Sequence, residues 1–167
     1  MISTGKILIV DDDPTFLETY NDFLGAEGYV VETATSAGEA RERVTHGEHA
    51  VVLIFYPGDM TPGCTMQLCS IRDEWKSFTD AGIRVLGVNP SSAASHERFK
   101  TVFHLPFPLL IDTDKKVSEA YDALFSFFGI RITRRTVVGI DKTGTVRYIK
   151  RGMPKTQDIL KAMQKYH

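Results

Sequence analysis

The sequence predicts an α/β fold in which one mixed sheet lies between helices. Short apolar runs alternate along the chain with stretches whose apolar residues recur at helical spacing. The run 50–56 is continuous and rich in β-branched residues, as expected for a central strand covered on both faces. Near the C-terminus, 136–140 and 145–149 flank a short polar turn and predict an antiparallel hairpin.

The remaining elements follow from the same periodicities. Asp13 is a favourable N-cap and Pro14 suits a first helical position, whereas Ser36 and Glu39 form a capping box. Besides the runs above, we expect strands at 6–10, 29–33, 83–88 and 109–111, and helices at 14–24, 36–44, 64–80, 95–103, 116–123 and 157–165.

Composition narrows the class of protein. The 167 residues, 43% hydrophobic and 25% charged, fit one soluble globular domain. A formal net charge of −1 without basic clustering argues against a nucleic-acid partner. No apolar run approaches the roughly 20 residues of a membrane helix, and the N-terminus lacks a signal-peptide pattern, so we expect no membrane partner and a cytoplasmic protein.

The residues after the predicted central strand place a thiol at the start of a helix. Cys64 follows the loop 57–63, and free backbone N–H groups at a helix N-terminus stabilise thiolate over thiol. Thr61 lies three residues upstream, where its hydroxyl can reach the sulfur or an oxygen of a bound substrate. Pro62 is expected to stiffen the loop and shield the thiolate.

A second cysteine, Cys69, lies five residues further along the same predicted helix. In an intact helix this spacing is a rise of about 7.5 Å and a rotation of roughly 140°, so the two sulfurs cannot bond. A disulfide between them therefore requires the first helical turns to unwind. The alternative is that both cysteines are small buried hydrophobic residues.

At these residues a family resemblance emerges. The segment FYPGDMTPGCTMQLCSIRDEW resembles the active-site region of peroxiredoxins of the bacterioferritin-comigratory or Q-type subfamily. The family pattern Pro-x-x-x-Thr-x-x-Cys falls on Pro57, Thr61 and Cys64, and the resolving cysteine of that subfamily falls on Cys69. The resemblance extends over residues 49–167 and implies a thioredoxin-like fold.

The resemblance also implies an activity and a further site residue. Alignment on the ID-x-x-G turn assigns to Arg135 the arginine that contacts thiolate and peroxide, with Arg134 as the fallback. The implied protein is a thiol peroxidase for hydrogen peroxide or organic hydroperoxides, which passes through a Cys64 sulfenic acid and a Cys64–Cys69 disulfide. Thioredoxin or a similar dithiol would reduce that disulfide, and no cofactor or metal is implied.

The N-terminal part resembles a different family. Residues 5–44 are similar to the opening of a response-regulator receiver domain, a flavodoxin-like βαβα segment, with Asp11 and Asp12 at its acidic metal-binding positions. Phe55 occupies the position of the phosphorylated aspartate, and the required lysine is missing. We therefore interpret the acidic cluster as a helix cap rather than a Mg²⁺ site. The rival hypothesis is a non-catalytic chimeric or signalling scaffold.

The two resemblances predict how the chain is organised. We expect a receiver-like segment, 1–48, and a peroxiredoxin segment, 49–167, fused into one globular domain, as a monomer or homodimer. The run 6–10 is expected to pair in parallel at the outer side of 83–88, packed onto the same sheet. Domain swapping and a receiver-like rearrangement are the alternatives.

Other histidines and aromatic residues are less informative. His96 and His104 have no partner at ligand spacing, which favours solvated or packing roles over metal binding. Five aromatic residues are expected in the core, with a substrate mouth or dimer contact as the alternative for the last three: Trp75, Phe78, Phe125, Phe127 and Phe128.

Overall fold

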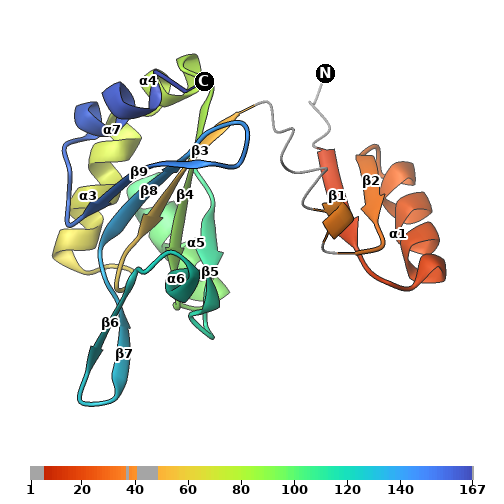
Figure 1. Cartoon of the computed structure of the whole chain (residues 1–167), viewed down its shortest axis with the longest axis horizontal. Helices are drawn as coiled ribbons and strands as arrows, with labels where there is room; N and C mark the ends of the chain where they lie inside the picture. Colours follow the sequence, from red (N-terminus) through yellow and green to blue (C-terminus); the bar gives the residue numbers. More distant parts are fainter. Residues whose placement is uncertain (1–5, 37, 41–48, 167) are drawn as a thin grey trace. The chain divides into compact units, whose positions relative to one another are not determined.

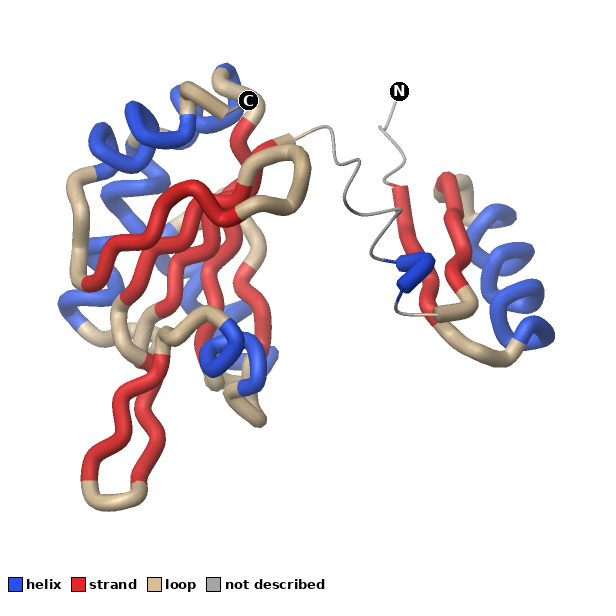
Figure 2. The backbone as a smooth tube through the Cα atoms, in the orientation of Figure 1, coloured by secondary structure: helices blue, strands red, loops and turns tan. Residues whose placement is uncertain are grey.

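A computed structural model of the chain describes residues 6–36, 38–40 and 49–166 (Figures 1 and 2). The chain divides into two compact units, Met1–Gly47 and Glu48–His167, and the described strands of each form separate sheets. The fusion of both segments into one domain stays a prediction. No described helix combines the length and the apolar character needed to cross a membrane.

The first unit is a strand–helix–strand motif. Its elements are β1 (Lys6–Val10), α1 (Pro14–Ala26) and β2 (Val30–Ala34), and the two strands pair in parallel. As predicted, Asp13 caps α1, and its carboxylate accepts from the backbone N–H of Thr15 at 2.8 Å. Helical backbone also follows at 38–40, but the rest of the helix predicted for 36–44 lies outside the described residues.

The second unit is built on a five-stranded mixed sheet of order β5-β4-β3-β8-β9. The predicted run 50–56 is its central strand, and β3 pairs in parallel with β4 and antiparallel with β8, as the thioredoxin-like resemblance implies. The bounds are β3 (Ala50–Phe55), β4 (Ile83–Asn89), β5 (Leu109–Ile111), β8 (Thr136–Ile140) and β9 (Val146–Arg151).

The pairing predicted for residues 6–10 is wrong. Instead of adding beside β4, this run pairs with β2, and the outer side of β4 pairs with β5. The physical reason is that β5, although three residues long, follows β4 through α5 and forms a parallel neighbour by a local crossover.

Five described helices belong to the second unit: α3 (Pro62–Asp73), α4 (Trp75–Asp80), α5 (Ala93–Phe103), α6 (Lys116–Ala120) and α7 (Thr156–Met163). The single helix predicted for 64–80 is divided at Glu74, whose φ of −101° and ψ of 14° leave the helical region. The break lets Trp75 and Phe78 on α4 both pack on the larger core cluster of the unit.

Alternate residues of β3 pack in two different core clusters, because successive side chains of a strand point to opposite faces of the sheet. Val52 and Ile54 belong to the larger cluster, together with residues of α3, α4, α5 and α7. Leu53 and Phe55 belong to the smaller one, which Ala123 completes beyond α6. The four side chains are at most 7% exposed, so β3 is the interior strand of the unit.

The structure contains a second hairpin that was not predicted. Aromatic residues expected in the core lie on it. Strands β6 (Leu124–Phe127) and β7 (Ile130–Thr133) form their own two-stranded sheet, which extends away from the five-stranded one (Figure 1). Phe125 and Phe128 are exposed there rather than buried in the core. Their apolar pattern was mistaken for core because a projecting hairpin and a buried segment show the same spacing.

We predict that Gly139→Ala destabilises the second unit by about 1–3 kcal/mol, as overpacking of a core does. A Cβ atom at this position of β8 would lie 2.2 Å from the sulfur of Met163 and 3.1 Å from Cβ of Tyr148. Urea unfolding measures the change in the free energy of unfolding. Gly58→Ala is the control, because a Cβ there meets no atom within 4 Å. Equal losses in both variants would contradict the steric account.

Candidate active site

Cys64 is the third residue of α3, the helix that follows the central strand. Thr61 is the N-cap residue and Pro62 begins the helix, so the backbone N–H groups of the first turn lack helical partners. The Cys64 side chain is fully buried. The predicted placement of a thiol at a helix N-terminus is therefore found.

An arginine from a distant part of the chain contacts this sulfur. The guanidinium of Arg135 donates a hydrogen bond from Nη2 to Sγ of Cys64 at 3.1 Å. Arg135 immediately precedes β8, and the antiparallel register of β3 and β8 places Thr136 opposite Phe55, at the end of the strand that leads to α3. A positive charge at this distance stabilises a thiolate.

Gly63 provides the space for this approach. A Cβ atom at position 63 would lie 2.7 Å from Nη2 and 3.3 Å from Cζ of Arg135. Such distances are shorter than van der Waals contact, so any other residue would push the guanidinium away. The glycine before the cysteine is thus a steric requirement of the arginine contact.

Arg134, the fallback, points elsewhere. Its Nη2 donates to the backbone carbonyl of Leu124 at 2.9 Å, at the start of the β6–β7 hairpin. Of the two adjacent arginines, the structure brings Arg135 to the cysteine. The Nε atom of Arg135 is buried and has no hydrogen-bond partner among the described residues. The same is true of Oε1 of Gln67, one turn after Cys64 on α3. The guanidinium thus keeps a donor for a further oxygen.

Thr61 and Pro57 frame the loop between β3 and α3. The Thr61 hydroxyl donates to the carbonyl of Gly58 at 3.4 Å, so it is directed into its own loop rather than to the predicted sulfur contact. Pro57 is exposed and lies two residues after the end of β3. Both residues shape the loop, and their part in the chemistry stays a prediction.

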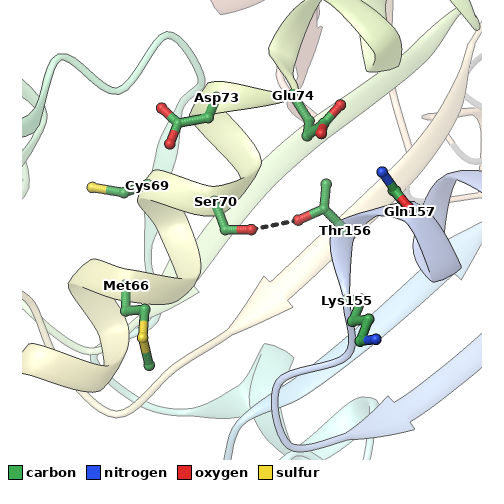
Figure 3. A pocket seen from close by; sticks show the side chains of 8 residues that line it. All are labelled: Met66, Cys69, Ser70, Asp73, Glu74, Lys155, Thr156 and Gln157. Atoms are coloured by element: carbon green, nitrogen blue, oxygen red, sulfur yellow. Dashed lines mark hydrogen bonds between the residues drawn. The ribbon is translucent and has the colours of Figure 1, made fainter.

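Cys69 lies on the same α3 helix and, like Cys64, is a free thiol. Its half-buried side chain borders a pocket of about 540 Å³ between α3 and the start of α7 (Figure 3). Across this pocket, the hydroxyl groups of Ser70 and Thr156 are hydrogen bonded at 2.7 Å. In Figure 3 the sulfur of Cys69 points away from Thr156, so Cys69 lies at the edge of this pocket, whereas Cys64 is fully buried.

A buried polar cluster under the loop could not be predicted from the sequence. The Asp59 side chain is 2% exposed and its oxygens accept four hydrogen bonds. Burial alone would raise the pKa of Asp59, but hydrogen bonds from Ser95, Asn89, His96 and Tyr56 together lower it. His96, expected to be a solvated or packing residue, belongs to this cluster. Its donors come from separate elements, so no sequence spacing predicts it.

Within the described residues, no group of three His, Cys, Asp or Glu side chains is arranged to hold a metal ion. The cysteine, the arginine and the loop between β3 and α3 form the centre of the described site. A buried cysteine at the first turn of a helix after the central strand, with an arginine on its sulfur, defines a thiol-active protein with a thioredoxin-like sheet.

Comparison with known proteins agrees with that class. The chain belongs to the AhpC/TSA family, whose family model matches residues 31–149. It is similar to peroxiredoxin Bcp of Bacillus subtilis (strain 168), with 38% identity over 128 residues, 68% of this chain and 81% of the relative. Chloroplastic peroxiredoxin Q of Oryza sativa subsp. japonica is 46% identical over 99 residues, 59% of this chain and 45% of that protein. The chain thus spans about half the length of its plant relatives.

Solved structures give the same fold. The bacterioferritin comigratory protein of Xanthomonas campestris superimposes with a TM-score of 0.66 and 28% identity, over 72% of this chain and 81% of that one. For BcpB of Mycobacterium tuberculosis the TM-score is 0.67, with 26% identity over 74% and 84% of the two chains. The receiver-like resemblance of residues 5–44 has no support in these comparisons.

We predict that the second unit loses stability in acid, because two of its carboxyl groups have lowered pKa values. Hydrogen bonds from Thr143 and Arg147 hold the pKa of Asp141 well below its ordinary value, and the pKa of Asp59 is also lowered. An unfolded chain binds protons at these groups near pH 4, so the stability they supply is fully present above about pH 5 and declines progressively as the pH falls below 4. Chemical unfolding at pH 6, 4 and 3 should show this decline.

Asp141→Asn tests the assignment, because the amide cannot titrate. Its free energy of unfolding should be lower than that of the wild type at pH 6 and fall less steeply below pH 4. Identical slopes in the two proteins would show that other groups govern acid unfolding.

Proposed function

We propose that this chain is a thiol-dependent peroxidase that reduces hydrogen peroxide or organic hydroperoxides. The observation that carries the proposal is the 3.1 Å hydrogen bond from Arg135 to the buried sulfur of Cys64 at the start of α3. The rival hypothesis, a non-catalytic scaffold, gives no reason for an arginine and a cysteine to converge in this way. Membership of the AhpC/TSA family supports the same conclusion.

In the first step the Cys64 thiolate attacks one oxygen of the peroxide. A sulfur–oxygen bond forms, the oxygen–oxygen bond breaks, and the leaving oxygen departs as water or an alcohol after taking a proton. Arg135 stabilises the thiolate, and its unpartnered Nε can donate to the leaving oxygen as negative charge develops there. Thr61 and Pro57 would shape the loop that the peroxide enters.

In the second step Cys69 attacks the sulfenic acid of Cys64, and water leaves as the disulfide forms. The two residues are five positions apart in the intact α3, so the first helical turns must unwind. The half-buried side chain of Cys69 beside an open pocket is suited to this exchange.

An external dithiol closes the cycle by reducing the Cys64–Cys69 disulfide. We infer thioredoxin or a similar dithiol protein as the reductant, because the resemblance to peroxiredoxins implies one. We place the reaction in the cytoplasm, where thiols are kept reduced. The Xanthomonas campestris relative is described by its alkyl peroxide reduction activity, which supports organic hydroperoxides among the substrates of this chain.

For residues 5–44 we infer descent from a receiver-like segment. The parallel pairing of β1 with β2 through α1 is the strand–helix–strand unit of such folds, and Asp11 and Asp12 keep the acidic positions. Without the aspartate and lysine that phosphotransfer requires, this segment would serve a non-catalytic purpose. Acetyl phosphate should leave the protein unlabelled, and stable phosphorylation would contradict this inference.

The central test is stopped-flow oxidation of the reduced protein by hydrogen peroxide, followed by the fluorescence of Trp75. We expect a rapid second-order phase that Cys64→Ser abolishes. Cys69→Ser should keep this phase but lose the slower first-order phase of disulfide formation. A wild-type rate no faster than that of an ordinary free thiol would overturn the proposed function.

We further predict that Arg135→Lys and Gly63→Ala each slow the first phase by about a hundredfold, the usual cost of losing one transition-state donor. The lysine keeps the charge but not the forked geometry, and the alanine displaces the guanidinium by contact with Nη2. Arg134→Ala is the matched control, since its guanidinium binds the Leu124 carbonyl. Equal slowing in all three variants would refute a specific role for Arg135.

A further inference from the structure

The Asp59 carboxylate ties the loop that precedes α3 and Cys64 to three neighbouring elements. Each of its oxygens accepts two hydrogen bonds, and the donors are the Tyr56 hydroxyl (2.9 Å), Nδ2 of Asn89 (2.7 Å), the Ser95 hydroxyl (2.6 Å) and Nδ1 of His96 (2.8 Å). Tyr56 follows β3, Asn89 ends β4, and the other two donors lie in the first turn of α5. One buried charge thereby connects β3, β4 and α5 to the loop.

The loop is held against its own backbone preference. Met60, directly after Asp59, has a φ of 60°, in the left-handed region that disfavours residues with a side chain. Such a conformation persists where surrounding contacts determine it, and the four hydrogen bonds of Asp59 are adjacent to it. Release of the carboxylate would therefore let the loop relax.

A second anchor lies on the other side of the two cysteines. Ser70, the residue after Cys69, is hydrogen bonded through its hydroxyl to Thr156 at the start of α7 (Figure 3). The stretch 60–69 thus runs between the Asp59 cluster and the Ser70–Thr156 bond. This is the stretch that must unwind for Cys64 to reach Cys69.

We propose that Asp59 is a positioning residue whose hydrogen-bonded cluster holds the loop before Cys64 and the first turn of α3 folded, and so determines the fate of oxidised Cys64. The inference rests on the proposed peroxidase function. While the loop is folded, the sulfenic acid stays beside Arg135, where a second peroxide can reach it. When the cluster opens, the first turns of α3 unwind and Cys69 can attack.

The two fates are distinct in their chemistry. In one, the sulfur of Cys69 bonds to the sulfur of Cys64, and the hydroxyl of the sulfenic acid leaves as water. In the other, a second peroxide transfers an oxygen to the Cys64 sulfur, its oxygen–oxygen bond breaks, and water or an alcohol leaves, so that sulfinic acid forms. The cluster influences the competition by controlling how often the helix opens.

The test compares Asp59→Asn with the wild type. The amide places an NH₂ group against donors, so the cluster loses two of its hydrogen bonds. We expect the first-phase rate to fall and the peroxide concentration that converts half of Cys64 to sulfinic acid to rise, each by about tenfold, as expected for lost bonds to a charged group. Mass spectrometry of quenched samples measures sulfinic acid and disulfide separately.

Asp141→Asn is the matched control, a buried carboxylate with several hydrogen bonds in the β8–β9 turn, away from the loop. It should lower stability without changing the ratio of sulfinic acid to disulfide. If Asp59→Asn does not fold, Tyr56→Phe and Ser95→Ala each remove one donor and should shift the ratio in the same direction. The same ratio in the wild type and in the foldable cluster variants would overturn the inference, whereas an unreactive wild type would overturn the proposed function.

Discussion

The hydrogen bond between Arg135 and Cys64 joins two segments 71 residues apart, and the rest of the site depends on it. It forms because β8 lies antiparallel to β3 with Thr136 opposite Phe55, which sets the arginine beside the first turn of α3. A slip of β8 by one residue would turn its side chains to the other face of the sheet. The strand register therefore governs the charge at the sulfur, while Gly63 supplies the space.

Much of this arrangement could be predicted from the sequence, because its signals are strong and local. The continuous apolar run 50–56 identified the central strand, and the cysteine after a Pro-Gly loop identified the helix start. The division of the helix at Glu74 was not predictable, since apolar spacing continues through it. The pairing of 6–10 was wrong because the outer side of β4 is taken by β5, which follows it through α5. The Asp59 cluster depends on donors from separate elements, which meet only in the folded sheet.

The two units differ in how their sheets are buried. Among the described residues of the first unit, Leu17 and Ala34 are the buried hydrophobic side chains. Two strands and one helix bury little apolar surface, and such a sheet is marginal by itself. By contrast, β3 of the second unit is covered on both faces, and every residue proposed for the chemistry belongs to that unit. Rigid packing and the reactive loop are thus combined in the same 120 residues.

Both cysteines lie on the same helix of one chain, and this determines the kinetic order of disulfide formation in the proposed cycle. Disulfide formation is then a unimolecular event, and its rate does not depend on the protein concentration or on the number of copies assembled. Dilution, which dissociates oligomers, would leave this step unaffected. The span of chain that must rearrange ends at the Ser70–Thr156 bond, so α7 and the sheet can keep their places through each turnover.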